Sequence, residues 1–321
     1  MKENKFNKKC FIAFLTLWNT TCLSINASEK ISDQKIKSNN QLFETINNKK
    51  MEINFKAPEN TTKKPTVVIV HAFGCVSADE ENKIYNTNYS KDYDMLTNML
   101  VEKGFKTAVI SRLGYGKSDD SDSPRTNENI VKEMRAALKE NNIEPPYILV
   151  GHSMGNLFCL EWIKSNEKDI SVYVGLDGMN PHYYYLPTMD NCPSLPDPKN
   201  FCPSLMDLKN KNLISNSMYK ECLYQNQNMW SLGKFKFPEK MPVRMFLSAG
   251  LLNNIGDKEQ GIEGWDGKML QDKNKELFSN SSNQKIICLE DGDHFLYRSG
   301  EHAKMIVSEI ENIVSKCVLP E

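Results

Sequence analysis

One serine of this sequence lies in a pattern that is typical of a catalytic nucleophile. The apolar run at 147–150 leads into Gly-His-Ser-Met-Gly at 151–155, and a helical pattern follows directly. The two glycines let the chain turn sharply from strand to helix, which holds the serine exposed at the N-terminus of the helix. The partial positive charge there favours developing negative charge. The spacing therefore predicts that Ser153 attacks a carbonyl carbon.

Acyl transfer at a serine also needs backbone N–H groups that point at the developing oxyanion. We expect one from Met154, the residue after the nucleophile. The second should come from the loop after an earlier buried strand at 66–70, where the sequence is His-Ala-Phe-Gly at 71–74. We predict the N–H of Phe73. Cys75 follows, but it has no neighbouring base that would activate a thiolate, so we expect it only to line the loop.

The base that activates this serine must be a histidine within reach of it. Of the five histidines in the chain, His294 follows the last apolar run and precedes the last helical pattern. An imidazole that titrates near neutrality suits this work, and His294 is a candidate for the base. The other four have ordinary structural explanations in loop motifs, in the long segment between strands or on the last helix: His71, His152, His182 and His302.

Four segments together resemble the α/β-hydrolase superfamily, from about residue 42 to the C-terminus. They are residues 71–74, 111–119, 151–155, and Asp-Gly-Asp-His at 291–294. The second segment is similar to the family's turn after strand 4, although Ser111 stands where aspartate is common, and Ala72 stands where the family usually has glycine. The resemblance implies an α/β-hydrolase fold and a triad of serine, acid and histidine in that chain order, with His294 as the histidine.

The acidic residue of this triad is the one that the sequence does not decide. The resemblance implies a carboxylate at the end of the sixth or the seventh strand. Asp177 directly follows the sixth apolar run, 172–176, and is our predicted acid. In the loop after the seventh run, Asn253 stands where relatives often have aspartate, and Asp257 is the alternative. Further candidates in that loop are Glu259 and Asp266.

The elements that must position these groups alternate along the chain. Residues 41–55 are typical of a hairpin, and six short apolar runs follow between residues 66 and 289. Helical patterns lie near 92–103, 127–141, 155–166 and 301–317. Short continuous apolar strands separated by helices indicate a mostly parallel sheet that is covered on both faces. We therefore predict one α/β domain over residues 41–318, with about eight strands.

Residues 179–240 break this alternation. They are rich in proline, contain the aromatic run 183–185 and Trp230, and show only weak helical periodicity. A connection of this length in a compact domain is usually functional, so we predict a lid or cap over the site. Cys192 and Cys202 lie in it, and the sequence is compatible with a disulfide or with two thiols.

Residues 1–27 are expected to be an export signal. Four lysines precede a short apolar run at 10–18, and a polar stretch ends at Ala27. The run is too short to span a bilayer of about 30 Å, and the layout is typical of a secretory signal. The sequence leaves open cleavage after Ala27, retention as an anchor, and a buried helix. Residues 28–40 would be a flexible leader, and the protein would be secreted or held at the cell surface through its N-terminus.

Composition narrows the classes of function. The 321 residues carry a formal net charge of −1, so there is no basic excess that would favour a nucleic-acid partner. Cysteines and histidines lack the spacing of a metal site, and Gly114-Tyr-Gly116 lacks the third glycine of a dinucleotide fingerprint. We expect no metal, no cofactor, and a small ester or acyl compound as the binding partner.

These residues together predict a serine esterase that works through Ser153, His294 and Asp177 and forms an acyl-enzyme. The same triad serves amidases, thioesterases and hydrolases of carbon–carbon bonds, and these alternatives stay open. Ser153 disfavours an epoxide or haloalkane hydrolase, which would use an aspartate nucleophile. A ligand-binding protein of the same fold without turnover is the alternative from another class, and the intact serine and histidine argue against it.

Overall fold

The computed structural model describes residues 37–44, 46–60, 63–74, 89–182, 189–201, 203–249 and 267–318. Several predictions fall outside these ranges: the export signal at 1–27, the possible disulfide partner Cys202, the aromatic run 183–185, and the loop that contains Asp257. Cys75 also lies outside them. In the part that is described, no helix is both long and apolar enough to cross a membrane.

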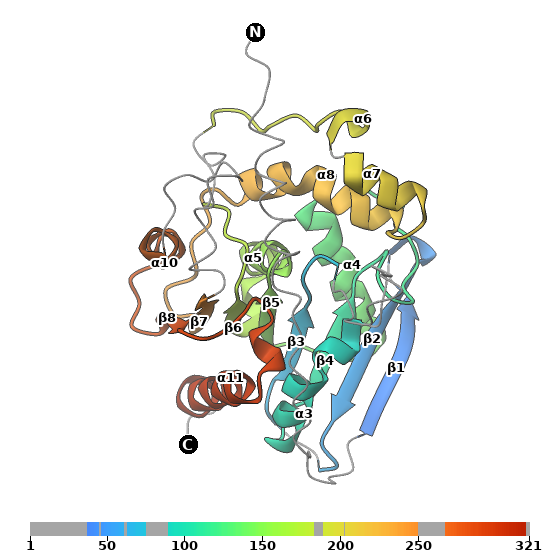
Figure 1. Cartoon of the computed structure of the whole chain (residues 1–321). Coiled ribbons are helices and arrows are strands. Elements are labelled where there is room, and N and C mark those ends of the chain that lie inside the picture. Colours follow the sequence, from blue (N-terminus) through green and yellow to red (C-terminus); the bar gives the residue numbers. More distant parts are fainter. Residues whose placement is uncertain are drawn as a thin grey trace.

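An eight-stranded sheet forms the centre of the fold (Figure 1). The strands lie in the order β1-β2-β4-β3-β5-β6-β7-β8, and all pairs from β4 to β8 are parallel. β2 runs antiparallel to both β1 and β4. The predicted mostly parallel sheet is therefore confirmed. Its strands are β1 (Lys37–Glu44), β2 (Lys50–Ala57), β3 (Thr66–Val70), β4 (Thr107–Ser111), β5 (Tyr147–His152), β6 (Ile170–Leu176), β7 (Val243–Ser248) and β8 (Gln284–Leu289).

The first strand begins earlier than the sequence indicated. β1 starts at Lys37, which is paired with Ala57 of β2, so residues 37–40 belong to the sheet and not to a flexible leader. These four residues are Lys-Ser-Asn-Asn and have no apolar alternation. A strand at the edge can be held by backbone hydrogen bonds alone, which leave no trace in the side-chain pattern. The turn that follows includes Asn47 at a φ of 62°, a left-handed conformation that asparagine tolerates.

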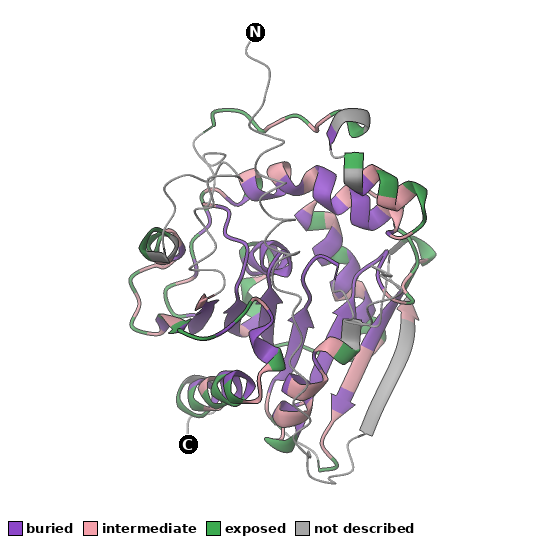
Figure 2. Ribbon diagram, in the orientation of Figure 1, coloured by how far each residue is buried: buried purple, intermediate pink, exposed green. Residues whose placement is uncertain are grey.

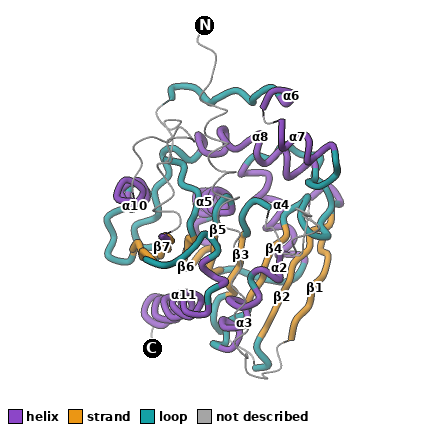
Figure 3. Tube along the Cα trace, viewed as in Figure 1, coloured by secondary structure: helices purple, strands orange, loops and turns teal. Residues whose placement is uncertain are grey.

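Helices cover both faces of the sheet (Figures 1 and 3). α3 and α11 pack together on one face, and α4 and α5 pack together on the other. The four helical patterns predicted from the sequence correspond to these helices. Their bounds are α3 (Asp94–Glu102), α4 (Asn127–Glu140), α5 (Gly155–Ser165) and α11 (Gly300–Ile313); the short α2 (Tyr89–Asp92) precedes α3, and α10 (Gly267–Lys275) precedes β8.

The two faces have separate apolar cores, and the strands contribute alternate residues to each. In β3, Val68 and Val70 pack with α4 and α5, whereas Val67 and Ile69 pack with α3 and α11. This is the two-residue period of a strand. Because both faces are buried, the central strands have continuous apolar sequences, and Figure 2 shows the buried centre between the helix layers.

Where it is described, the segment between β6 and β7 contains α6 (Pro198–Phe201), α7 (Pro203–Asn210) and α8 (Asn216–Ser231), together with irregular stretches. These helices lie beyond the carboxyl ends of the parallel strands (Figure 1). α8 begins at a Ser215 cap whose side chain accepts from the N–H of Met218. Its helical periodicity is weak in the sequence because it buries polar residues, including Glu221 and Gln225, beside apolar ones. The described Cys192 is a free, exposed thiol.

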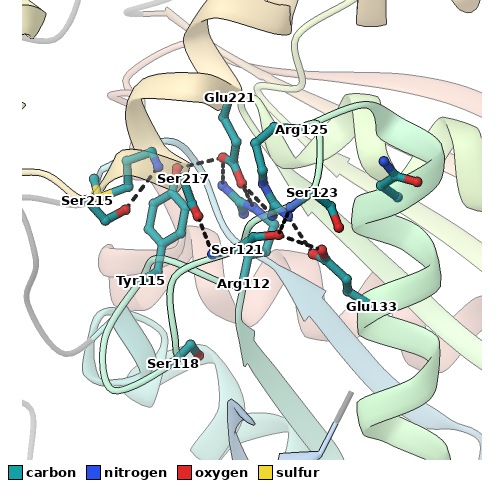
Figure 4. A network of polar contacts seen from close by, with 12 residues as sticks. Arg112, Tyr115, Ser118, Ser121, Ser123, Arg125, Glu133, Ser215, Ser217 and Glu221 are labelled. Carbon is teal, nitrogen blue, oxygen red and sulfur yellow. Dashed lines mark hydrogen bonds and ion pairs between the residues drawn. The ribbon is translucent and has the colours of Figure 1, made fainter. Parts of the chain in front are cut away.

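Buried ion pairs attach α8 to the rest of the domain (Figure 4). Arg112, which follows β4, lies 3.0 Å from a carboxylate oxygen of Glu221, and both side chains are 0% exposed. Arg125 lies 3.3 Å from the other oxygen of Glu221 and 2.6 Å from Glu133 of α4. The hydroxyl of Tyr115 donates to Glu221 at 2.6 Å. A buried carboxylate is tolerated only when such donors and charges surround it.

Glu221→Gln should weaken folding at neutral pH by about 3–5 kcal/mol, because it leaves the buried guanidinium of Arg112 without the carboxylate that balances its charge. Burial alone would raise the pKa of Glu221, but Arg112 and Arg125 outweigh it and hold that pKa below its usual range. A carboxyl with a lowered folded pKa stabilises the fold above its unfolded pKa of about 4.3 and loses that contribution as the pH falls through the folded value.

The difference in the free energy of unfolding between the wild type and Glu221→Gln should therefore become smaller below about pH 4. Urea unfolding at pH 7 and at a series of acidic pH values measures it. The control is Glu128→Gln, which removes an exposed pair with Lys132 and should leave the free energy of unfolding nearly unchanged. A difference that stays constant with pH would contradict a charged, paired Glu221.

Candidate active site

Ser153 occupies the sharp turn between β5 and α5. Its φ is 52°, a left-handed conformation that is uncommon outside glycine. Backbone hydrogen bonds hold it there: its N–H donates to the carbonyl of Leu176 at 3.1 Å, and its own carbonyl accepts from the N–H of Met179 at 2.8 Å. A strained serine fixed between a strand and a helix is the geometry that a nucleophile elbow requires.

Gly155 lets α5 approach the end of β3 more closely than any side chain would permit. A Cβ atom there would lie 2.2 Å from the carbonyl oxygen of Val70 and 2.6 Å from that of His71. A Cβ atom on Gly151 would lie 3.0 Å from the Cα of Asn156. The glycines thus serve the turn and also bring the N-terminus of α5 beside the loop that follows β3.

We expect Gly155→Ala to destabilise the fold by about 3 kcal/mol or more, because backbone must move to admit the methyl group. The control is Gly104→Ala. A Cβ atom at Gly104 meets nothing within 4 Å, although its φ is 80°, so only a backbone penalty of about 1–2 kcal/mol applies. Urea unfolding of both variants measures the difference. An equal loss of unfolding free energy in Gly155→Ala and Gly104→Ala would show that α5 can move away from β3 without destabilising the fold.

Asp177 directly follows β6, and its side chain is 0% exposed. One carboxylate oxygen lies 3.3 Å from Nδ1 of His294. The carboxylate also accepts from the N–H of Ser248 at 2.7 Å and from the hydroxyl of Ser248 at 2.5 Å. A carboxylate accepts only, so Nδ1 carries the proton of a neutral His294 and Nε2 is left as the basic nitrogen.

Ser248 is the residue of this site that sequence reasoning missed. It is the last residue of β7 and directly follows the apolar run at 243–247, and its type and spacing match no catalytic motif. β7 is the parallel neighbour of β6, so the residues after both strands emerge at one edge of the sheet. This adjacency is the only signal that connects Ser248 to Asp177, and it needs the strand order to be known.

His152 holds the loop that carries His294. Its Nε2 lies 2.9 Å from the carbonyl oxygen of His294, and its Nδ1 lies 2.9 Å from the hydroxyl of Tyr93. Burial, together with the nearby His294, lowers the pKa of His152 well below its usual value, so the ring is neutral. Nε2 must then donate to the carbonyl, and Nδ1 accepts from Tyr93. The rings of His152 and His294 lie 4.8 Å apart between centroids.

Two further histidines, His182 and His302, form contacts away from Ser153 and Asp177. His182 lies 3.1 Å from a carboxylate oxygen of Glu276, and His302 lies 2.9 Å from one of Asp291. Of the predicted acids, Asp177 is the one that the structure brings to His294. Asp257 and its neighbours Glu259 and Asp266 lie outside the described residues.

The loops that carry Phe73 and Met154 leave adjacent strands. Val70, the last residue of β3, is in register with Gly151 of β5, so both chains pass the edge of the sheet side by side. The strand order reverses here, because β4 lies on one side of β3 and β5 on the other, and such switch points are where ligands bind in open α/β sheets. Met154 directly precedes α5, whose first N–H groups have no acceptor within the helix.

Comparison with known proteins identifies the fold. Residues 65–233 match the family model described as alpha/beta hydrolase fold. The chain belongs to the α/β-hydrolase fold family. The resemblance inferred from the four motifs is thereby confirmed, and the departures at Ser111 and Ala72 are compatible with membership.

Two curated relatives from Bacillus subtilis match parts of this α/β hydrolase. Uncharacterized protein YbdG is 28% identical over 121 residues, which are 38% of this chain and 34% of that protein. Uncharacterized protein YqjL is 36% identical over 77 residues, which are 24% of this chain and 30% of that protein. The chain thus spans about a third of the length of these curated relatives.

Solved structures share the fold over nearly the whole domain. An esterase from Exiguobacterium antarcticum superposes with a TM-score of 0.56 at 13% identity and covers 85% of this chain and 98% of its own. Epoxide hydrolase VrEH1 from Vigna radiata superposes with a TM-score of 0.56 at 15% identity. The match covers 89% of this chain and 99% of the chain of that structure. At such identities the likeness concerns the fold and leaves the reaction to the residues of the site.

Proposed function

We propose that this α/β hydrolase is an exported serine esterase that uses Ser153, His294 and Asp177. The observation that carries the proposal is the contact between Nδ1 of His294 and the buried carboxylate of Asp177, on the same sheet edge as the strained Ser153. The predicted export signal at 1–27 supports a place outside the cytoplasm.

In this mechanism the hydroxyl of Ser153 attacks the ester carbonyl while Nε2 of His294 accepts its proton. Asp177 stabilises the resulting imidazolium and keeps its Nδ1–H oriented. The N–H groups of Phe73 and Met154 donate to the oxyanion of the tetrahedral intermediate. His294 then gives the proton to the leaving alcohol, and water attacks the acyl-enzyme with His294 again as the base.

The nature of the nucleophile favours an acyl substrate over an epoxide. Attack of Ser153 on an ester gives another ester, which water can hydrolyse. Attack of a serine on an epoxide carbon would give an ether, which has no carbonyl for water to attack, and turnover would stop. The activity named for the Vigna radiata structure therefore does not transfer to a chain with serine at this position.

The experiment that tests the proposal is labelling of the wild-type protein with a fluorophosphonate, followed by peptide mass analysis and by a panel of p-nitrophenyl esters of increasing acyl length. We expect a single labelled residue, Ser153, and hydrolysis of at least one ester. A matched panel of anilides and thioesters separates the ester assignment from its alternatives. Absence of labelling at Ser153 would overturn the proposal.

A further inference from the structure

Arg112 reaches beyond Glu221 to the loop that follows β3. Its Nη1 donates to the carbonyl oxygen of His71 at 2.5 Å, and its Nη2 donates to that of Ala72 at 3.3 Å. Nδ1 of His71 lies 2.6 Å from the same Ala72 oxygen. The guanidinium therefore holds the two carbonyl groups that directly precede Phe73.

The carbonyl of Ala72 and the N–H of Phe73 are the two ends of one peptide unit. That unit is planar and trans, so its C=O and N–H point in opposite directions. A donor that fixes the Ala72 oxygen on one side consequently fixes the direction of the Phe73 N–H on the other. The pull of a positive charge on that oxygen also polarises the unit and strengthens the N–H as a donor.

The guanidinium is itself held by a carboxylate and by two aromatic rings. Its Nε and Nη2 donate to the two oxygens of Glu221 at 3.2 and 3.0 Å (Figure 4). Its central carbon lies 4.5 Å from the ring centroid of Tyr115 and 4.8 Å from that of Phe158. A bidentate contact with a carboxylate, together with contacts to two aromatic rings, sets the plane of an arginine in a way that lysine does not reproduce.

We propose that Arg112 is a positioning residue that aims the Phe73 N–H into the oxyanion hole, and that Glu221 of α8 holds Arg112 in place. This inference rests on the proposed serine-esterase function. It gives the helical segment between β6 and β7 a role in the reaction: the oxyanion donor on the β3 loop is aligned only when α8 is docked on Arg112.

The test compares Arg112→Lys with Glu133→Gln. Glu133 belongs to the same buried network but has no contact with residues 71–73 among the described hydrogen bonds. Active sites are first counted by fluorophosphonate titration run to completion. The value of kcat per titrated site and KM are then measured for an ester and for its thionoester, whose sulfur is a poor acceptor of hydrogen bonds from an oxyanion hole.

For Arg112→Lys we expect kcat on the ester to fall on the order of 10²-fold, as for a catalytic group displaced by about 1 Å, with little change in KM. The preference for ester over thionoester should fall with it, because that preference reports the oxyanion donors. Glu221→Gln should also lower kcat on the ester and the preference for ester over thionoester, but by a smaller factor than Arg112→Lys does. Glu133→Gln should lower thermal stability and keep the wild-type kcat and the wild-type preference.

If Arg112→Lys keeps the wild-type kcat per titrated site and the wild-type preference for ester over thionoester, the inference is overturned. The esterase proposal would still stand. If Arg112→Lys yields no titratable sites, Glu221→Gln decides by the same preference: an unchanged value overturns the inference and a reduced value supports it. Failure of the proposed function looks different, since the wild-type protein itself would not be labelled at Ser153.

Discussion

Ser153→Ala should remove covalent labelling by a fluorophosphonate and lower ester turnover by about 10⁶-fold, because the hydroxyl that forms the acyl-enzyme is gone. The fold should remain, since the backbone bonds from Ser153 to Leu176 and Met179 do not involve the side chain. The measurements are kcat for a chromogenic ester, mass analysis of the labelled protein, and the thermal unfolding midpoint.

Ser165→Ala is the matched control. Ser165 is at the other end of α5, where its hydroxyl donates to the carbonyl of Glu161 at 2.7 Å. This variant should be labelled like the wild type and retain its turnover. Persistent labelling of Ser153→Ala at another serine would show that the nucleophile has been misassigned.

Much of the framework around Ser153 was predictable from short stretches of sequence. The central strands are apolar on both faces, so β3 and β5 stand out as continuous runs at 66–70 and 147–150. Gly151 and Gly155 mark the turn because sterics at that point exclude side chains. Asp177 could be proposed beside Asp257 because it directly follows an apolar run, at one of the two places where the resemblance to the α/β hydrolases implies the acid.

Features that depend on the tertiary arrangement were not predictable in this way. β1 pairs through its backbone, and residues 37–40 carry no apolar alternation. The role of Ser248 needs the adjacency of β6 and β7. Arg112 and Glu221 are 109 residues apart, and each is a charged residue that a sequence pattern assigns to the surface. Only the fold shows that both are buried against each other.

Asp177→Asn should lower kcat by about 10⁴-fold, as the equivalent change does in serine-protease triads. The amide is close in size to the carboxylate but has no charge to stabilise protonated His294. Its NH₂ group can also donate to Nδ1, which would favour the tautomer with the proton on Nε2 and so remove the base. The backbone should tolerate the change, because Asp177 has a φ of 42° and asparagine accepts left-handed conformations as readily as aspartate.

Two further variants locate the acid. Asp257→Asn tests the alternative from the seventh-strand loop, and it should keep wild-type kcat if Asp177 is the acid. Ser248→Ala removes one of the two donors that Ser248 gives to Asp177, so it should lower kcat by much less than Asp177→Asn does. The values of kcat and thermal midpoint are measured for all three on one chromogenic ester. If Asp177→Asn loses stability but keeps its rate while Asp257→Asn loses its rate, then Asp177 only anchors the ends of β6 and β7, and the charge that stabilises His294 comes from the loop after β7.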